Sequence, residues 1–235
     1  FICFMIKIQN VTKSFKKNKA LDNLSLKVEA GEIYGLLGAN GAGKSTTLNL
    51  LLGFLEADSG SIELFDDSSS KKITSDSIGF IPENVNLYEY LSGIENLDYF
   101  CKIAGFKFSH SELKDMLNEC GLENDAHSKK TSDYSKGMRQ KVGIAIALAK
   151  NAKIYLLDEP ASGLDPMASN ELSEILKKLS AKGSTILMAS HDIFRVRETC
   201  DKIGILKQGS LIKEMSSKDV TSNELENIYL NFMKS

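Results

Sequence analysis

The stretch that decides the fold reads Gly38-Ala39-Asn40-Gly41-Ala42-Gly43-Lys44-Ser45-Thr46. It matches the pattern G-x-x-x-x-G-K-[ST] at every fixed position. An apolar run, Ile33 to Leu37, precedes it, and leucines at helical spacing follow it. In a strand–loop–helix arrangement, glycines let consecutive backbone N–H groups point inward, and the helix adds the positive end of its dipole. The stretch therefore predicts a loop that cradles phosphate groups.

This loop, a P-loop, also carries the side chains that a nucleoside triphosphate requires. Lys44 is expected to reach the β- and γ-phosphates, and the Ser45 hydroxyl is expected to bind Mg²⁺. A glycine-rich turn without a ligand is the alternative, which the Lys44-Ser45 pair and the flanking segments disfavour. The expected nucleotide-binding residues of the loop are Gly38, Asn40, Gly41, Ala42, Gly43, Lys44, Ser45 and Thr46.

The composition limits the classes of function. The 235 residues include 29 Lys and Arg against 31 Asp and Glu, which gives a formal net charge of −2. This balance gives no electrostatic support to nucleic-acid binding, so we expect no nucleic-acid partner. The apolar runs fall well short of the roughly 18 residues that span a bilayer. Any membrane-spanning part is therefore expected to come from another subunit.

Four cysteines lie far apart in the chain and show no C-x-x-C spacing. This pattern favours free thiols in a reducing, cytoplasmic compartment over a disulfide framework. His110 and His127 have no ligand-like neighbours in the sequence, so we expect both at the surface. Residues 1–4 lack the basic region of a signal peptide and are expected to be an extension of a single domain, residues 5–235.

Apolar periodicity predicts the elements of the first two thirds. Short apolar bursts between residues 5 and 37 predict strands, and Ser61 to Phe65 predicts another. Asp66 to Ser77 is polar and predicts a loop, whereas Ile78 to Ile81 predicts a short strand. From about residue 86 to residue 148, apolar residues recur at helical spacing, which predicts an inserted helical subdomain.

The last third returns to alternating strands and helices. Ile154 to Leu157 and Thr185 to Ala189 predict buried strands, with a helix between them that ends at Gly183. Residues 202–215 predict a hairpin, and residues 223–235 a terminal helix. The alternation predicts an α/β fold, in which helices flank a mainly parallel sheet and the early strands form an antiparallel β subdomain.

Two acids end the strand Ile154 to Leu157. A carboxylate at the end of a strand beside a P-loop is placed to hold Mg²⁺, directly or through water, and we expect Asp158 to do so. Glu159 is the expected general base that polarises an attacking water. A polar strand end is the alternative when the pair is considered alone, and the P-loop favours the catalytic interpretation.

A second helix start is notable. Ser135, within Tyr134-Ser135-Lys136-Gly137-Met138, is a plausible N-cap for a helix that runs through Val142 and Leu148. Its free N–H groups and hydroxyl would form a second anion-binding end. Capping alone also explains the segment when it is viewed in isolation.

The motifs resemble those of the ATP-binding subunits of ABC transporters, over essentially the whole chain from Met5 to about Met215. They occur in the order P-loop, Tyr134-Ser135-Lys136-Gly137-Met138, Asp158-Glu159, Ser162-Gly163-Leu164-Asp165 and His191. A Ser-x-Gly signature about 20 residues before an apolar strand ending in Asp-Glu-Pro separates this family from other P-loop proteins. The resemblance implies that the chain is a P-loop ATPase.

The resemblance also implies roles for residues outside the P-loop. In the family, two subunits pack head to tail around two ATP molecules, so Ser135 and Gly137 would bind the γ-phosphate in the partner's site. Asp165 would line the same interface. His191 matches the switch histidine that senses the γ-phosphate, although a lone histidine would otherwise favour a structural role. Phe15 falls where the family stacks an aromatic ring on adenine.

The chain departs from the family pattern at two places. The usual signature is Leu-Ser-Gly-Gly-Gln, whereas this chain has Tyr134, Lys136 and Met138 at the variable positions. Glu83 stands where the family usually has Gln on the loop that leads to the helical insertion. Its carboxylate would still coordinate Mg²⁺, but it adds negative charge beside the phosphates. Both variants are similar to those of single-domain exporter ATPases.

These observations together predict an ATPase subunit on the cytoplasmic face of a membrane. We expect a second ATPase subunit, identical or related, and a separate membrane permease that inserts a helix near Glu83 to Leu91 and exports its substrate. A soluble ABC ATPase such as an iron–sulfur assembly type is the alternative. A nucleotide-binding scaffold without catalysis is disfavoured, because Lys44, Asp158, Glu159 and His191 are all present.

Overall fold

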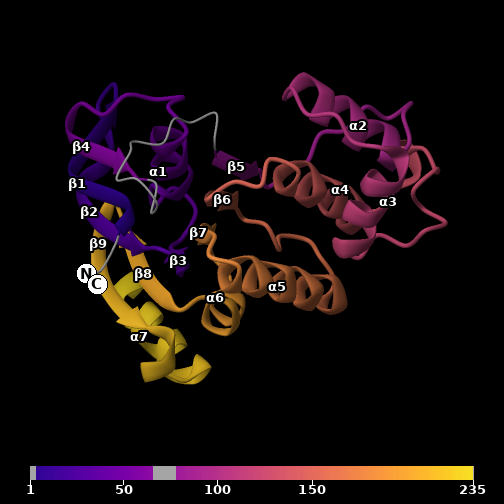
Figure 1. Ribbon diagram of the computed structural model, residues 1–235. Helices are drawn as coiled ribbons and strands as arrows, with labels where there is room; N and C mark the ends of the chain where they lie inside the picture. Colours follow the sequence, from indigo (N-terminus) through magenta and orange to yellow (C-terminus); the bar gives the residue numbers. More distant parts are fainter. Residues whose placement is uncertain (1–3, 66–77, 235) are drawn as a thin grey trace.

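Two sheets organise the protein. The computed structural model describes residues 4–65 and 78–234. The larger sheet has six strands in the order β5-β6-β7-β3-β8-β9 (Figure 1). Its strands are β3 (Ile33–Leu37), β5 (Ile78–Ile81), β6 (Ile154–Asp158), β7 (Thr185–Ser190), β8 (Lys202–Lys207) and β9 (Ser210–Ser216). All neighbours are parallel except the β8–β9 hairpin, which confirms the predicted, mainly parallel sheet and its hairpin.

The central strands are buried on both faces, because consecutive side chains of a strand point to opposite sides of the sheet. Tyr155 and Leu157 pack into one apolar cluster, whereas Leu156 packs into another. Helix α1 (Lys44–Leu51) covers the face of Leu156, and the longer helix α5 (Pro166–Ala181) covers the opposite face. Parallel strands buried on both faces read as continuous apolar runs, as these do.

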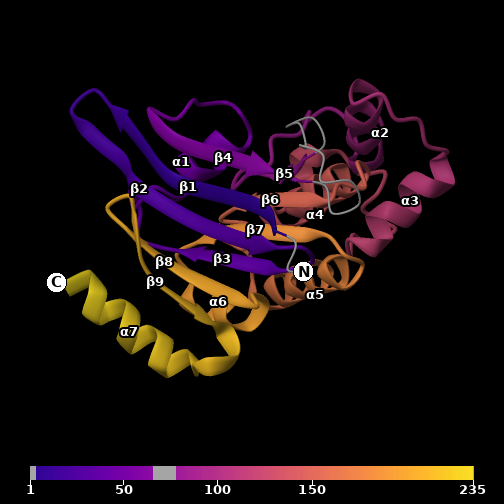
Figure 2. The ribbon, with the colours of Figure 1, turned by 60° about the vertical axis from the view of Figure 1, so that its left-hand side comes forward.

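The early strands form a separate antiparallel sheet in the order β2-β1-β4, as predicted (Figure 2). Strands β1 (Phe4–Phe15) and β2 (Asn18–Glu29) are longer than the apolar bursts indicate, because polar residues alternate with buried ones to the strand ends. Strand β4 (Ser59–Leu64) begins two residues before the predicted Ser61. The predicted loop of residues 66–77 lies outside the described residues, as do residues 1–3 of the predicted extension.

Three helices gather at one end of the molecule, as the helical spacing predicts (Figure 1). They are α2 (Gly93–Ile103), α3 (His110–Glu119) and α4 (Lys136–Leu148). Both α2 and α3 begin with capping boxes, in which Ser92 pairs with Glu95 and Ser109 pairs with Glu112. Fully buried leucines such as Leu97 hold the three helices together.

The prediction that His127 lies at the surface is wrong. Its side chain is only 1% exposed, because the loop between α3 and α4 folds over it and its Nε2 lies 2.9 Å from the carbonyl oxygen of Leu122. His110, at the start of α3, is exposed as expected. A lone histidine in a polar stretch thus gave no indication that the loop closes around it.

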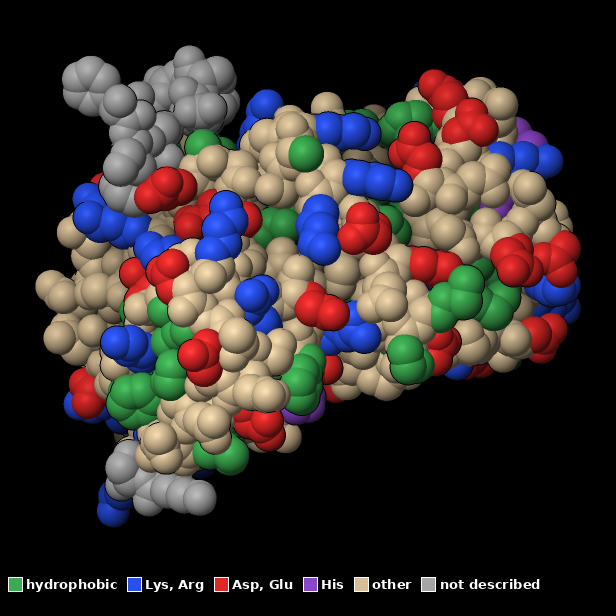
Figure 3. Space-filling view, turned by 90° about the horizontal axis from the view of Figure 1, so that it is seen from below, with side chains coloured by type: hydrophobic (Ala, Val, Ile, Leu, Met, Phe, Trp, Pro, Cys, Tyr) green, Lys and Arg blue, Asp and Glu red, His purple; other side chains and the backbone are tan. Residues whose placement is uncertain are grey.

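Helices α6 (Ile193–Thr199) and α7 (Ser222–Lys234) complete the face that α5 covers. Helix α7 runs alongside β8 and β9 (Figure 2), and Lys207 donates a hydrogen bond to the carbonyl oxygen of Phe232. None of the helices within residues 4–65 and 78–234 has both the length and the apolar character needed to cross a lipid bilayer. On the face in Figure 3, acidic and basic side chains of the described residues are interspersed.

The three described cysteines test the packing of the core. Cys101, Cys120 and Cys200 are free and buried. Burial raises the pKa of Cys101 to about 11 and that of Cys120 to about 12, and it also raises the pKa of Cys200. The thiolate is the nucleophile, so a raised pKa and burial both slow the reaction of a thiol. In a Cys3→Ser variant, which keeps only the three buried cysteines, these thiols should react with a thiol reagent at pH 8 on the order of 100-fold more slowly than an unhindered thiol. Unfolding in urea should make all three thiols react rapidly with the reagent. Rapid labelling of the native variant would contradict this packing.

Candidate active site

The carboxyl ends of the parallel strands β3 and β6 meet at a cavity of about 350 Å³, and the end of β7 lies beside it, where His191 contacts Glu159. The P-loop leaves β3, Glu159 follows β6, and the His191 loop follows β7. In open α/β sheets this edge is where ligands bind. The cavity is lined by Phe15, Asn18, Ala20, Ala39, Asn40, Gly41, Gly43, Lys44, Ser45, Thr46, Glu83 and Glu159.

The P-loop backbone requires glycine. Gly43 has φ +110°, and a Cβ there would lie 2.6 Å from the carbonyl oxygen of Ala20. Gly41 also adopts a left-handed backbone, with φ +80°. Gly43 is the N-cap of α1, and it has no side chain that could accept hydrogen bonds from the first N–H groups of this helix. These N–H groups are therefore available to a ligand in the cavity.

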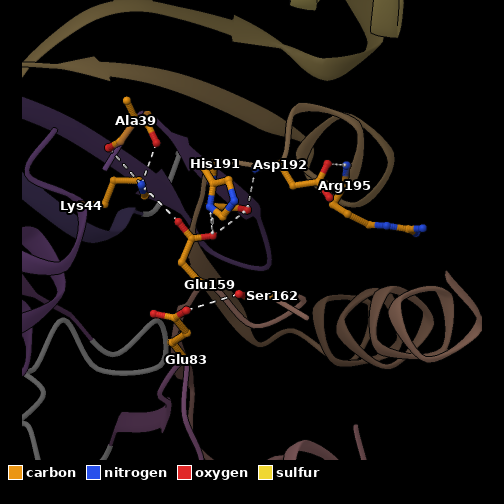
Figure 4. Close-up of polar contacts among 10 residues, drawn as sticks. Ala39, Lys44, Glu83, Glu159, Ser162, His191, Asp192 and Arg195 are labelled. Atoms are coloured by element: carbon orange, nitrogen blue, oxygen red, sulfur yellow. Dashed lines mark hydrogen bonds and ion pairs between the residues drawn. The ribbon is translucent and has the colours of Figure 1, made fainter. Parts of the chain in front are cut away.

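Lys44 is held deep in the loop by three oxygen atoms. Its side chain is only 6% exposed. The ammonium donates hydrogen bonds to the carbonyl oxygens of Gly38, at 2.6 Å, and Ala39, at 3.2 Å, and it lies 3.1 Å from Oε1 of Glu159. The ion pair ties the P-loop after β3 to the end of β6 (Figure 4).

Glu159 lies between Lys44 and the loop after β7. Its Oε2 accepts hydrogen bonds from the Ser190 hydroxyl and the His191 amide, both at 3.2 Å, and it lies 2.9 Å from Nδ1 of His191. Burial raises the pKa of this carboxyl, but the His191 hydrogen bonds and the Lys44 charge together outweigh it and lower the pKa below its ordinary value. Glu159 is therefore a carboxylate at neutral pH.

Asp158 has the opposite shift. Burial raises the pKa of its carboxyl, and the neighbouring Ser45 hydroxyl only partly opposes the rise. Its Oδ1 is buried and has no hydrogen-bond partner among the described residues. A buried carboxylate oxygen without a partner, beside a hydroxyl and the carboxylate of Glu83, provides the oxygen ligands that Mg²⁺ prefers. The residues present fit the predicted Mg²⁺ site.

Glu83 approaches the cavity from the segment between β5 and α2. Its Oε1 accepts a hydrogen bond of 3.3 Å from the Ser162 hydroxyl (Figure 4). The structure therefore brings Phe15, Glu83, Glu159 and most of the predicted P-loop residues to one cavity, with His191 in contact with Glu159.

Seven predicted site residues are absent from this lining. Gly38, Ala42, Asp158 and His191 belong to the strand ends and loops that border the cavity, whereas Ser135, Gly137 and Asp165 lie elsewhere. Ser135 is the N-cap of α4, where its hydroxyl accepts from the amide of Met138, and Gly137 follows in the first turn. Asp165 is the N-cap of α5 and accepts from the amide of Ala168. The capping interpretation of Ser135 is therefore confirmed.

Sequence reasoning missed two polar contributors. Ser190 holds Glu159 by a hydrogen bond, and Asn18 lines the cavity from the start of β2. The signal for Ser190 was available, since it is a polar residue at the end of a buried apolar strand directly before His191. Asn18 carries no such local signal.

A buried P-loop lysine paired with a carboxylate at the end of a parallel strand defines a P-loop nucleotide-binding protein. The family model for ABC transporters matches residues 21–162, and the chain belongs to this family. It is 37% identical to the lantibiotic transport ATP-binding protein SrtF of Streptococcus pyogenes, covering 97% of this chain and 96% of that protein. It is 34% identical to the bacitracin transport ATP-binding protein BcrA of Enterococcus faecalis, covering 92% of this chain and 71% of that protein.

Solved structures share the fold. The dimeric structure of a post-hydrolysis state of the ATP-binding cassette MJ0796, bound to ADP and Pi, superposes with a TM-score of 0.79 at 30% identity. The comparison covers 91% of this chain and 99% of that one.

The Lys44–Glu159 ion pair makes a pH-dependent prediction. In Lys44→Met, Glu159 keeps its charge but loses a buried partner, so the free energy of unfolding should fall by about 1–3 kcal/mol at pH 7. The pKa of Glu159 is lowered in the folded state from its ordinary 4.5. The stability from this pair is therefore complete above pH 4.5 and is lost as the pH falls through the folded pKa.

Urea unfolding of both proteins at pH 7 and at pH 4 measures this effect. The wild type should exceed Lys44→Met by less at pH 4 than at pH 7. In a Glu159→Gln background the same substitution should show no such change. A deficit that is independent of pH in both backgrounds would exclude the ion pair as its cause.

Proposed function

We propose that this chain is the ATP-hydrolysing subunit of an ABC transporter, with a core, an antiparallel β part and a helical part of residues 86–148 within one domain of residues 5–235. The main support is that Glu159 contacts both Lys44 of the P-loop and His191. Family membership and the ADP-bound relative support nucleotide as the ligand.

In this proposal the P-loop amides and Lys44 bind the β- and γ-phosphates, and Phe15 stacks on the adenine. Phe15 is 45% exposed at the edge of the cavity, so its ring is accessible to a base. Stacking is tolerant of base identity, so discrimination between ATP and GTP should be weak. Ser45, Asp158 and Glu83 would hold Mg²⁺, which when bound neutralises charge on the phosphate oxygens.

Glu159 is the proposed general base. A base must be ionised and must lie within hydrogen-bond reach of the proton that it removes. The lowered pKa keeps this carboxyl ionised, and the contacts with Ser190 and His191 fix its orientation. His191 stays 54% exposed on the side chain, so its ring can also contact the γ-phosphate or the attacking water.

We propose that two such subunits pack head to tail, with Ser135, Gly137 and Asp165 of each facing the nucleotide of the other. The dimeric structure of MJ0796 supports such a pair. The position of these residues outside the cavity lining of their own chain is consistent with a role in the partner's site. ATP with Mg²⁺ would join the subunits, and hydrolysis would release them.

A separate membrane permease is the proposed partner, and it would hold the chain at the cytoplasmic face. The rings of Tyr88, Tyr99 and Phe100 pack together, and neighbouring Tyr90 is 87% exposed. This aromatic surface lies on the segment between Glu83 and the end of α2 and suits an apolar helix of the permease. The relatives named for lantibiotic and bacitracin transport support an exporter.

Replacing the proposed base should separate binding from turnover. In Glu159→Gln, loss of the base should reduce the rate of ATP hydrolysis by about 10²–10⁴-fold. ATP should still bind, because Lys44 and the P-loop amides remain. Phosphate release and size-exclusion chromatography with ATP and Mg²⁺ measure the two effects, and we expect a retained dimer.

Glu174→Gln is the matched control, since this glutamate is exposed on α5 and should leave hydrolysis unchanged. Undiminished hydrolysis in Glu159→Gln would refute the base assignment. A dimer that never forms in either protein would count against the proposed head-to-tail pair.

A further inference from the structure

The turn after Glu159 holds this residue in an unfavourable backbone conformation. Glu159 has φ +45°, a left-handed value that costs free energy for a residue other than glycine. The Ser162 amide donates a hydrogen bond of 3.0 Å to the carbonyl oxygen of Glu159. The Leu164 amide donates one of 3.1 Å to the carbonyl oxygen of Ala161. Residues 159–164 thus form a hydrogen-bonded turn that fixes the backbone of the proposed base.

Two side chains from outside the large sheet reach this turn. Glu83, from the segment that leads to the helices, accepts the Ser162 hydroxyl. Lys136 is the first residue of α4, and its side chain lies over Gly163. A Cβ added at Gly163 would lie 3.2 Å from Cδ and 3.3 Å from Nζ of Lys136, so the side chain is packed against the glycine backbone.

The contact with Gly163 is a packing contact along the Lys136 side chain, from Cδ to Nζ, rather than a hydrogen bond or an ion pair. Within residues 4–65 and 78–234, the Lys136 ammonium forms neither a hydrogen bond nor an ion pair with another side chain. Gly163 has φ +70° and no side chain, which leaves room for the methylene groups. Long lysine stems commonly cover apolar or backbone surface in this way.

We propose that Lys136 is a positioning residue for ATP hydrolysis. Its stem holds the turn of residues 159–164, and through the Ser162–Glu159 hydrogen bond it stabilises the backbone that presents the Glu159 carboxylate. Because Lys136 begins α4, the placement of this helix against the core is transmitted to the base within the same chain. The inference rests on the proposed function for its catalytic consequence, but the contact with the turn does not.

Truncation of the stem tests the catalytic consequence. Lys136→Ala should lower kcat for ATP hydrolysis about tenfold through misplacement of the base, with KM for ATP within about twofold. Lys136→Met and Lys136→Arg keep a stem and should retain at least about half of the wild-type kcat. Lys114→Ala, an exposed lysine on α3, is the matched control and should leave kcat unchanged.

Amide hydrogen exchange tests the contact independently of activity. The Ser162 amide, which bonds Glu159, should exchange about tenfold faster in Lys136→Ala than in the wild type or in Lys136→Met. Unchanged protection of this amide in Lys136→Ala overturns the inference, whether or not the protein hydrolyses ATP. An inactive wild type with faster exchange in Lys136→Ala would instead overturn only the proposed function.

A double-mutant cycle with Glu83→Gln adds a second criterion. Glu83 and Lys136 contact adjacent residues of one turn, so their effects on kcat should be non-additive. Equal losses of kcat in Lys136→Ala and Lys136→Met would show that the charge acts, for instance on the partner's nucleotide, and would overturn the stem mechanism. Fully additive effects would show that the two contacts act separately and would also count against it.

Discussion

The ion pair between Lys44 and Glu159 is the interaction on which the arrangement of the site depends. Each residue stands at the end of a different parallel strand, and both side chains are about nine-tenths buried. A buried charge is tolerated only when its remaining hydrogen-bonding capacity is satisfied. The carbonyl oxygens of the P-loop complete the shell of Lys44, and the loop after β7 completes that of Glu159. One pair therefore fixes three loops relative to each other.

The sheet makes this convergence stable. Strands β6, β7 and β3 are neighbours in one parallel sheet, so their carboxyl ends lie at the same edge. Their side chains are buried on both faces, and a shift in register by one residue would exchange the two sets of side chains. The apolar packing thus maintains the register that places Asp158, Glu159 and His191 at the P-loop.

Local patterns predicted most of the fold and part of the site. The P-loop, the acids at the end of β6 and the helical spacing of residues 86–148 are properties of short windows, so sequence reasoning could find them. The burial of His127 and the contact of Glu83 with Ser162 depend on residues that meet only in the folded chain, in the second case 79 positions apart. Periodicity reports which face of an element is buried, but it does not report which side chains meet.

The left-handed backbone at Glu159 explains how two consecutive acids serve one site. Consecutive side chains of a strand point to opposite faces, so an extended chain would direct Asp158 and Glu159 apart. With φ +45° at Glu159 the strand ends there, and both carboxyl groups face the P-loop, one beside Ser45 and the other beside Lys44. Their pKa values then shift in opposite directions, because the first has few partners and the second has several. Backbone strain at one residue thereby gives adjacent carboxyl groups different chemistry.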